Sequence, residues 1–107
     1  MSPKELEEIA DGWVDEFSVE PYVVRQREMD AWFKLGDLIH NEPLTAIMVF
    51  ERVAAKDLIN WTFEGFASGP VRTFLMLYGD RHDGELVALG RRSRVFEEMW
   101  AMATEGL

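Results

Sequence analysis

The chain has 107 residues and a mass of 12.4 kDa, which predicts a single domain covering residues 1–107. An apolar content of 48% argues against a disordered chain, and the absence of cysteine excludes disulfide scaffolds and thiolate metal sites. The net charge of −9 argues against direct nucleic-acid binding, and no apolar run reaches the roughly 18 residues of a membrane span. The polar start does not match a signal peptide, so we expect a cytoplasmic protein.

The first predicted helix covers residues 3–17. Ser2 is a good N-cap, Pro3 suits the first helical position and Glu5 completes a capping box. Its apolar residues recur with helical spacing on one face: Leu6, Ile9, Ala10, Trp13, Val14 and Phe17. The pattern predicts an amphipathic helix with one face in the core.

This first segment is also strongly acidic. Residues 1–20 hold seven acids against Lys4 alone, a net charge of −6, and lead into a helical core predicted at 22–105. Four of the acids form a stripe along the helix: Glu7, Glu8, Asp11 and Asp15. Like charges at this spacing destabilise a helix, and no nearby base neutralises them. We interpret the stripe as a docking site for a basic partner; the alternative is a solvated face.

Two more helices are predicted in the next third of the chain. The second spans residues 22–40 and ends at a break around 41–43, because proline disfavours helical geometry in the residue before it. The third spans residues 44–55. Its stretch 46–50 is also β-prone, but no partner strand is evident nearby, and we expect a helix.

The remaining chain predicts short helices separated by tight turns. A fourth helix covers residues 58–67 and ends at 68–70, where glycine closes one helix and proline begins the next. The fifth covers residues 71–78. Residues 85–89 add one or two turns, and Ser93 caps a last helix.

Together these elements predict an all-α domain of six or seven short helices, packed as successive antiparallel hairpins. The residues expected to be largely buried are Trp13, Phe17, Trp32, Ile47, Phe50, Phe74, Leu75, Phe96 and Trp100. No sheet of three or more strands is expected.

The stretch 66–80, Phe-Ala-Ser-Gly-Pro-Val-Arg-Thr-Phe-Leu-Met-Leu-Tyr-Gly-Asp, is the most distinctive part of the sequence. It resembles the central motif of an uncharacterised family of small bacterial helical domains, Ala-x-Gly-Pro-[Leu/Val]-x-x-[Leu/Phe]-Leu. Phe96, in a helix with an arginine-rich start, is similar to that family's last helix, so the resemblance covers about residues 28–103. It implies an all-helical fold and no established activity. Arg72 departs from the acid that the family usually has there.

Residues capable of catalysis or metal binding are sparse. His82 lies between Asp80 and Asp83, but zinc normally needs three or four ligands, and a capping turn explains the group better. Glu51 and Glu64 have apolar neighbours, which in a pocket would raise a carboxyl pKa, yet each fits the outer face of an amphipathic helix. We predict no catalytic residue, no metal ligand and no cofactor.

Aromatic residues are plentiful, and the four tryptophans fall on four different predicted helices: Trp13, Trp32, Trp61 and Trp100. One reading is an aromatic-rich core to which each helix contributes. The other is an exposed interaction groove. Trp61 and Phe63 support it, because two residues separated by one position point about 200° apart on a helix. We therefore predict that both contribute to partner binding.

These observations favour a non-enzymatic protein-interaction module of a bacterium or phage. Its partner would be a protein with a basic surface, and an inhibitor or immunity-type protein that occupies a phosphate-binding surface is the closest analogy. One alternative is a small enzyme that uses Glu51 and Glu64. Another is a self-associating module in which the basic segment 91–94 meets the acidic helix of a second copy.

Overall fold

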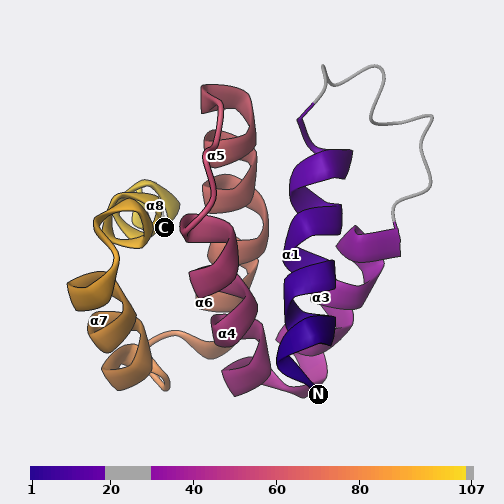
Figure 1. The fold of residues 1–107 in the computed structure, drawn as a ribbon. Coiled ribbons are helices and arrows are strands. Elements are labelled where there is room, and N and C mark those ends of the chain that lie inside the picture. The colour runs from indigo at the N-terminus through magenta and orange to yellow at the C-terminus, as the bar shows by residue number, and fades with distance from the viewer. Residues whose placement is uncertain (19–29, 106–107) are drawn as a thin grey trace.

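The computed structural model describes residues 1–18 and 30–105, and helices make up 83% of them (Figure 1). The elements are α1 (Pro3–Glu16), α3 (Asp30–Asn41), α4 (Pro43–Ala54), α5 (Asn60–Phe66), the π-helix η1 (Ala67–Val71), α6 (Arg72–Tyr78), α7 (Asp83–Arg92) and α8 (Arg94–Thr104). No strand occurs within the described ranges, so the all-α prediction is confirmed. The β-prone stretch 46–50 lies inside α4.

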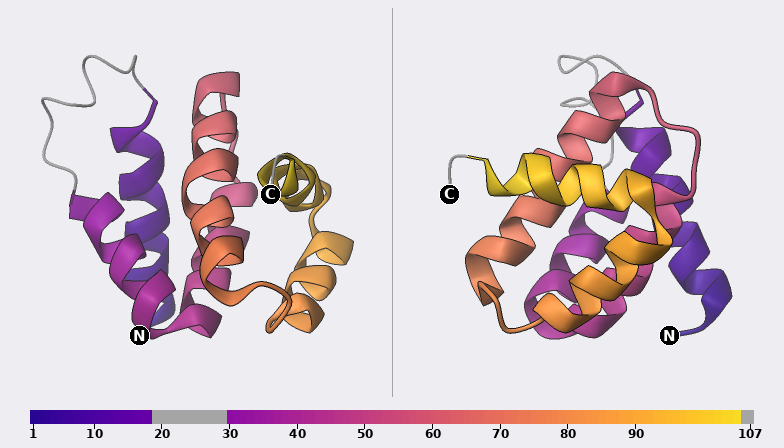
Figure 2. Two further views of the ribbon diagram at one scale, coloured as in Figure 1. Left: turned by 180° about the vertical axis from the view of Figure 1, so that it is seen from behind. Right: turned by 90° about the vertical axis from the view of Figure 1, so that its left-hand side faces the viewer.

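Helices α1, α3 and α4 alternate in direction and pack side by side (Figures 1 and 2). Elements α5, η1 and α6 follow without interruption and form one helix over residues 60–78, here called the long helix, which runs antiparallel to α4. Helix α7 follows after a short turn and packs against α8 and α4, and α8 crosses the long helix at η1 (Figure 2). The antiparallel arrangement therefore holds for α1, α3, α4 and the long helix.

Most helix ends lie close to the predicted positions. Helix α3 coincides with the second half of the helix predicted at 22–40; its first half lies outside the described residues. Helix α7 is ten residues long, more than the one or two turns expected at 85–89. None of the described helices combines the length and the apolar character that crossing a bilayer requires.

The predicted helix end at 68–70 is wrong, because the chain continues through it as η1. Pro70 has no backbone N–H and would interrupt an ordinary α-helix. Here the hydrogen-bonding pattern widens instead, and the N–H of Arg72 donates to the carbonyl of Ala67, five residues earlier. The Gly-Pro pair thus marks a π-helical segment of one continuous helix.

Every described helix contributes to one buried cluster, with Phe50 of α4 at its centre. Its ring lies 5.5 Å from Phe66 and 5.6 Å from Phe74, both edge-on, and 6.2 Å from Phe96. Trp13 of α1 meets Phe66 edge-on at 4.7 Å. This chain of rings joins α1, α4, the long helix and α8, and such pairs add about 0.5–1.5 kcal/mol each beyond their buried area.

Six of the nine predicted core residues are buried: Trp13, Ile47, Phe50, Phe74, Leu75 and Phe96. Phe17 and Trp100 are partly buried against the core. The prediction for Trp32 is wrong, since 45% of the residue is exposed. Helix α3 turns Ala31 and Leu35 inward, and Trp32 lies about 100° away from Ala31.

Side chains from distant elements cap several helix ends. The Thr62 hydroxyl donates to the carbonyl of Phe17 at 2.9 Å, just after α1. The Arg72 guanidinium donates to the carbonyl of Ala103 at 3.1 Å, at the end of α8. The Tyr78 hydroxyl donates to two carbonyls at the end of α3. These bonds satisfy terminal carbonyls that the helices leave unpaired, and they fix the helices relative to one another.

Candidate partner-binding surface

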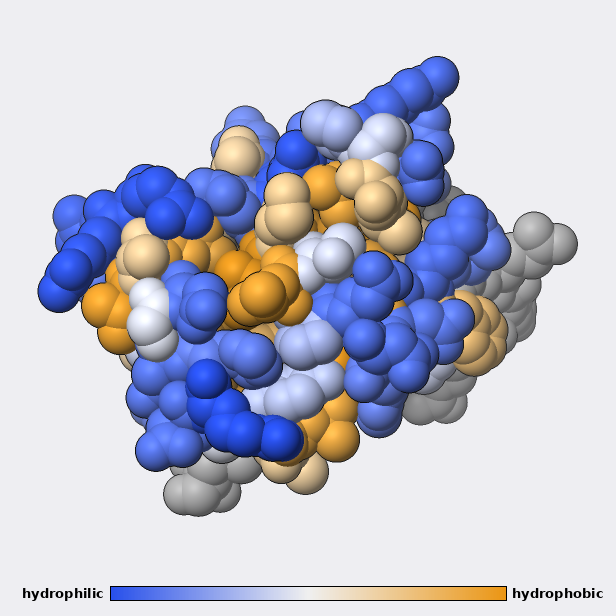
Figure 3. Space-filling view, turned by 90° about the horizontal axis from the view of Figure 1, so that it is seen from below, coloured by the Kyte–Doolittle hydropathy of each residue, from blue (hydrophilic) through white to orange (hydrophobic). Residues whose placement is uncertain are grey.

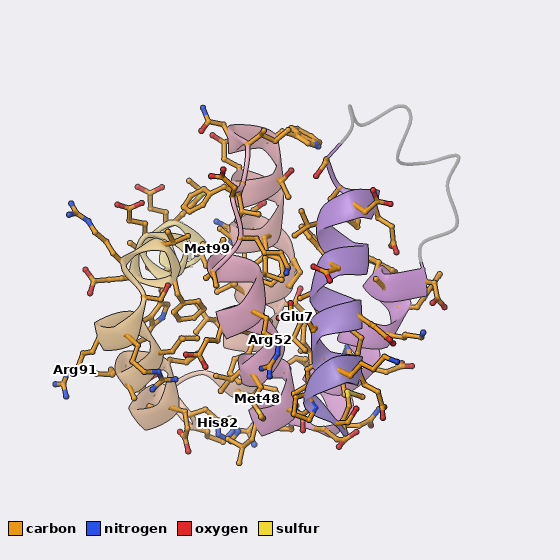
Figure 4. The ribbon with its side chains drawn as sticks, viewed as in Figure 1. Glu7, Met48, Arg52, His82, Arg91 and Met99 are labelled. Carbon is orange, nitrogen blue, oxygen red and sulfur yellow. The ribbon has the colours of Figure 1, made fainter. Side chains whose placement is uncertain are left out.

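The acids of the predicted stripe do not share one environment. Lys56, just after α4, approaches Glu7 at 2.7 Å and Asp11 at 2.5 Å. Figure 4 shows Glu7 pointing from α1 toward α4, next to Arg52. The expectation that no base neutralises the stripe is therefore wrong. This base was not apparent because Lys56, which follows α4, is distant from α1 in sequence.

Lys56 responds to these two acids. Partial burial lowers the pKa of its amine, but hydrogen bonds with Asp11 and Glu7 outweigh this effect and raise the pKa above 10.5. The charged form is therefore favoured. These pairs hold α1 on α4, and they give Glu7 and Asp11 a structural role.

Glu8 lies on the other side of α1, facing α3, where a groove of about 420 Å³ separates the two helices. Six carboxylate side chains line this acidic groove: Glu5, Glu8, Glu16, Asp30, Asp37 and Glu42. Apolar or small residues line its base: Ile9, Gly12, Ala31 and Leu38. Lys34 is the only lysine or arginine among its described lining residues. Of the four acids of the predicted stripe, Glu8 is the one that lines this groove.

Lys34 is affected by the charge of the acidic groove. Its amine lies 2.9 Å from Asp30, one turn earlier on α3. The hydrogen bond with Asp30 is the main cause that raises the pKa of Lys34, and Glu8 and Glu16 raise it further. Charges on both helices thus favour the protonated form of this lysine.

Two contacts bring α1 and α3 together beside the groove. The Glu16 carboxylate accepts hydrogen bonds from the backbone N–H of Ala31 at 2.9 Å and of Trp32 at 3.3 Å. It therefore caps the first turn of α3. A Cβ added at Gly12 would lie 3.0 Å from the Cβ of Ala31, so the close approach requires glycine. Glu16 is consequently a structural member of the groove.

A second groove, of about 300 Å³, lies between α3 and the long helix. It is lined by Trp32, Phe33, Leu35, Gly36, Asp37, Ile39, His40, Pro70 and Thr73, and is here called the aromatic groove. Trp32 is 45% exposed and Phe33 63% exposed, and their rings meet edge-on at 5.1 Å. Asp37 lines both grooves, so they are adjacent along α3.

Sequence reasoning missed both grooves. Asp30 and Asp37 repeat at a spacing of seven on α3, as an acidic row would, and this signal was readable. Trp32 and Phe33 are consecutive, and two consecutive helical residues point about 100° apart, so both cannot face the core fully. The sequence does not show which helix packs beside the acidic residues of α3 and which packs beside Trp32 and Phe33.

Trp61 and Phe63, the predicted aromatic pair, do not form one exposed surface. Trp61 is 43% exposed, whereas Phe63 is partly buried against the core. Neither residue lines the acidic or the aromatic groove. Asp15 is exposed and follows Asp11 by one turn of α1. Of the six predicted binding residues, the structure places only Glu8 in a groove.

The candidates for chemistry lie apart from both grooves. Glu51 forms an ion pair with Arg92 at 3.0 Å, and Glu64 is exposed on α5. His82 packs against Phe74 and Tyr78, with ring centroids 5.7 Å and 5.2 Å apart. Within residues 1–18 and 30–105, no three His, Cys, Asp or Glu side chains come close enough to hold a metal ion.

The arginines of the basic segment 91–94, like the acids of the stripe, lie in different environments. Arg92 is held by Glu51, whereas Arg91 points away from the body of the molecule (Figure 4). Arg94 is exposed and lies 3.7 Å from Glu98, a loose pair on one helix. Arginine ends of this kind are solvated and contribute little to stability.

The face seen from below in Figure 3 carries apolar residues in its middle, surrounded by polar ones. Helix α4 begins and α6 ends at this side of the molecule (Figure 1). Exposed apolar residues on these turns and on α7 are Leu44, Met48, Leu77 and Val87. Figure 4 places Met48 at this end of the molecule.

Comparison with protein-family models, with characterised proteins and with solved structures finds no match to this chain. The functional proposal therefore rests on the geometry and chemistry of the two grooves.

Proposed function

We propose that the protein is a non-enzymatic interaction module whose acidic groove binds a basic surface of another protein. The observation that supports this is the groove itself, where six carboxylates and one lysine surround an apolar base. An inhibitor or immunity-type protein, which competes with phosphate for a basic surface, is the function class that this chemistry suits best.

Electrostatics gives the groove both attraction and specificity. Carboxylates on two helices and one connecting residue act on the same volume, so a lysine or arginine placed there is attracted by several of them at once. Charges arranged in this way increase the rate of encounter with a basic partner and exclude acidic ones. The apolar base adds contacts that a purely charged surface would lack.

Glu8 and Glu42 are the residues to change. The described part of the structure shows no hydrogen bond or ion pair for either side chain, so their loss should leave the fold intact. We would compare the double variant Glu8→Gln, Glu42→Gln with a matched control, Glu64→Gln, Glu97→Gln, which removes the same charge from exposed positions elsewhere.

The experiment is affinity capture from a lysate of the source organism, followed by affinity measurement with each captured protein. We expect a captured protein with a basic surface, an affinity that falls as salt rises, and a loss of at least tenfold in the groove variant but not in the control. Equal affinities for the two variants, or capture of acidic proteins only, would contradict the proposed function.

A further inference from the structure

The aromatic groove exposes side chains that a small domain normally buries. Trp32 and Phe33 are neighbours on α3, and both side chains are exposed: the exposed fraction is 45% for Trp32 and 63% for Phe33. Leaving apolar area in water costs about 25 cal/mol for each Å². Contiguous exposed apolar surface next to a hollow marks an interaction site more often than scattered apolar residues do. Tryptophan in particular serves as an anchor at the centre of interfaces.

The groove also has room for an incoming side chain. A Cβ built on Gly36 would meet nothing within 4 Å, so the middle of the groove is open. Pro70 and Thr73 of the long helix form the opposite wall. Pro70 lies in the π-helical segment, an irregularity that in other helices is often found at functional sites.

Charge indicates what kind of side chain and what kind of partner would bind. Among the described residues no lysine or arginine lines the aromatic groove, whose polar lining residues are Asp37, His40 and Thr73; it shares Asp37 with the acidic groove. An apolar anchor bound beside Trp32 would therefore be followed, across α3, by carboxylates. This arrangement is complementary to a segment that has one apolar face and one basic face.

We propose that the aromatic groove receives the apolar face of a cationic amphipathic helix, while the basic residues of that helix meet Asp37 and the acidic groove. The inference rests on the proposed function, because it names the form of the basic partner. Helix α3 has 12 residues, about 18 Å at 1.5 Å per residue, so three turns of a partner helix lying along it would contact both grooves.

The test uses synthetic peptides of defined chemistry. The first is an 18-residue peptide with leucine on one helical face and lysine on the other. The second has the same composition in scrambled order, which retains the charge but removes the apolar face. Both are titrated into the protein, and binding is followed by calorimetry and by the indole N–H signals of the four tryptophans in NMR spectra.

Trp32→Ala tests the aromatic groove, and Trp61→Ala is the matched control because Trp61 is equally exposed, at 43%, and lies outside both grooves. We expect the amphipathic peptide to bind at least tenfold more tightly than the scrambled one. Trp32→Ala should lower that affinity at least tenfold and Trp61→Ala less than twofold. The indole signal of Trp32 should shift on binding, and that of Trp61 should not.

Two outcomes distinguish this inference from the proposed function. If both peptides bind equally and the double variant Glu8→Gln, Glu42→Gln weakens the binding of both, the acidic groove binds cations, but the proposal of an amphipathic partner helix is overturned. If Trp32→Ala weakens binding and the charge variant does not, the partner is not recognised by its charge, and both proposals fail in their present form. No binding of either peptide would also overturn the amphipathic-helix proposal.

Discussion

Glu16 and Ala31 join the end of α1 to the start of α3. The Glu16 carboxylate accepts a hydrogen bond from the backbone N–H of Ala31 at 2.9 Å, in the first turn of α3. The acidic groove lies between these two helices, so its width depends on this contact.

The first prediction concerns this cap. Glu16→Ala should lower the free energy of unfolding by about 1 kcal/mol, because two backbone donors of α3 lose their acceptor. Glu16→Gln should cost less, since the amide oxygen still accepts. Glu8→Ala, exposed on the same helix, should change stability by less than about 0.5 kcal/mol. Urea denaturation measures all three; equal values for Glu16→Ala and Glu8→Ala would show that the cap contributes nothing.

The second prediction is that alanine substitutions at two glycines have opposite effects on stability. Gly12→Ala places a Cβ 3.0 Å from the Cβ of Ala31, and the resulting overpacking should exceed the gain in helix propensity and destabilise the protein by about 1 kcal/mol. Gly36→Ala meets nothing within 4 Å and should stabilise the protein by about 0.5–1 kcal/mol. Thermal and chemical denaturation would check the signs. A stabilising Gly12→Ala would show that α1 and α3 can move apart without cost.

Arg72 provides the third prediction. Its guanidinium donates to the carbonyls of Met102, Ala103 and Glu105, so Arg72→Met should cost about 1.5–3 kcal/mol. Arg72→Glu should cost more, because a carboxylate would face the carbonyl end of α8. Arg91→Met, on an exposed arginine, is the control. Should Arg72→Met and Arg91→Met unfold at the same urea concentration, the bonds to α8 would not contribute to stability.

The fourth prediction is a pH dependence at Lys56. Its pKa is raised above 10.5 in the folded protein, so its contribution to stability is complete below about pH 10.5 and is lost as the pH rises through the folded-state pKa. The difference in unfolding free energy between the parent and Lys56→Met should thus be constant from pH 7 to about pH 10 and shrink above it. Lys4→Met controls for the loss of one positive charge. A difference that grows above pH 10.5 would contradict the pairing with Glu7 and Asp11.

The fifth prediction separates a core ring from a surface ring. Phe74 is fully buried against Phe50, and Phe74→Ala should cost about 3–5 kcal/mol. Trp32 is 45% exposed, and Trp32→Ala should cost less than about 1 kcal/mol. Denaturation curves compare the two directly. A loss above 3 kcal/mol for Trp32→Ala would place this ring in the core and remove the basis of the aromatic groove.

The helices could be predicted because the spacing of the apolar residues shows which face of each helix is buried. Leu6, Ile9 and Trp13 identify the buried face of α1, and the structure buries all three. Gly69-Pro70 misled the prediction, because a glycine-proline pair usually separates two helices. Here packing of Phe66 and Phe74 on the same ring of Phe50 favours a continuous helix, and this tertiary contact cannot be read from local sequence.

The candidate surface was predictable only in part. An acidic first helix was evident from composition, but the division of its acids was not, because Lys56 follows Glu7 by 49 positions. Glu8, one residue further along α1, lines the acidic groove instead. Which side of a helix lines a groove depends on the neighbouring helices, so the position of Glu8 in the acidic groove could be found only from the packing.

The π-helical segment Ala67–Val71 acts in effect as an inserted residue, and it sets the rotation of everything that follows it in the long helix. Deleting Pro70 would restore an ordinary α-helix but would turn α6 by about 100°. Phe74 would then leave the ring of Phe50, and Arg72 would lose the end of α8. A deletion of this kind would exchange the buried and exposed faces of half a helix, although the helix itself would become more regular.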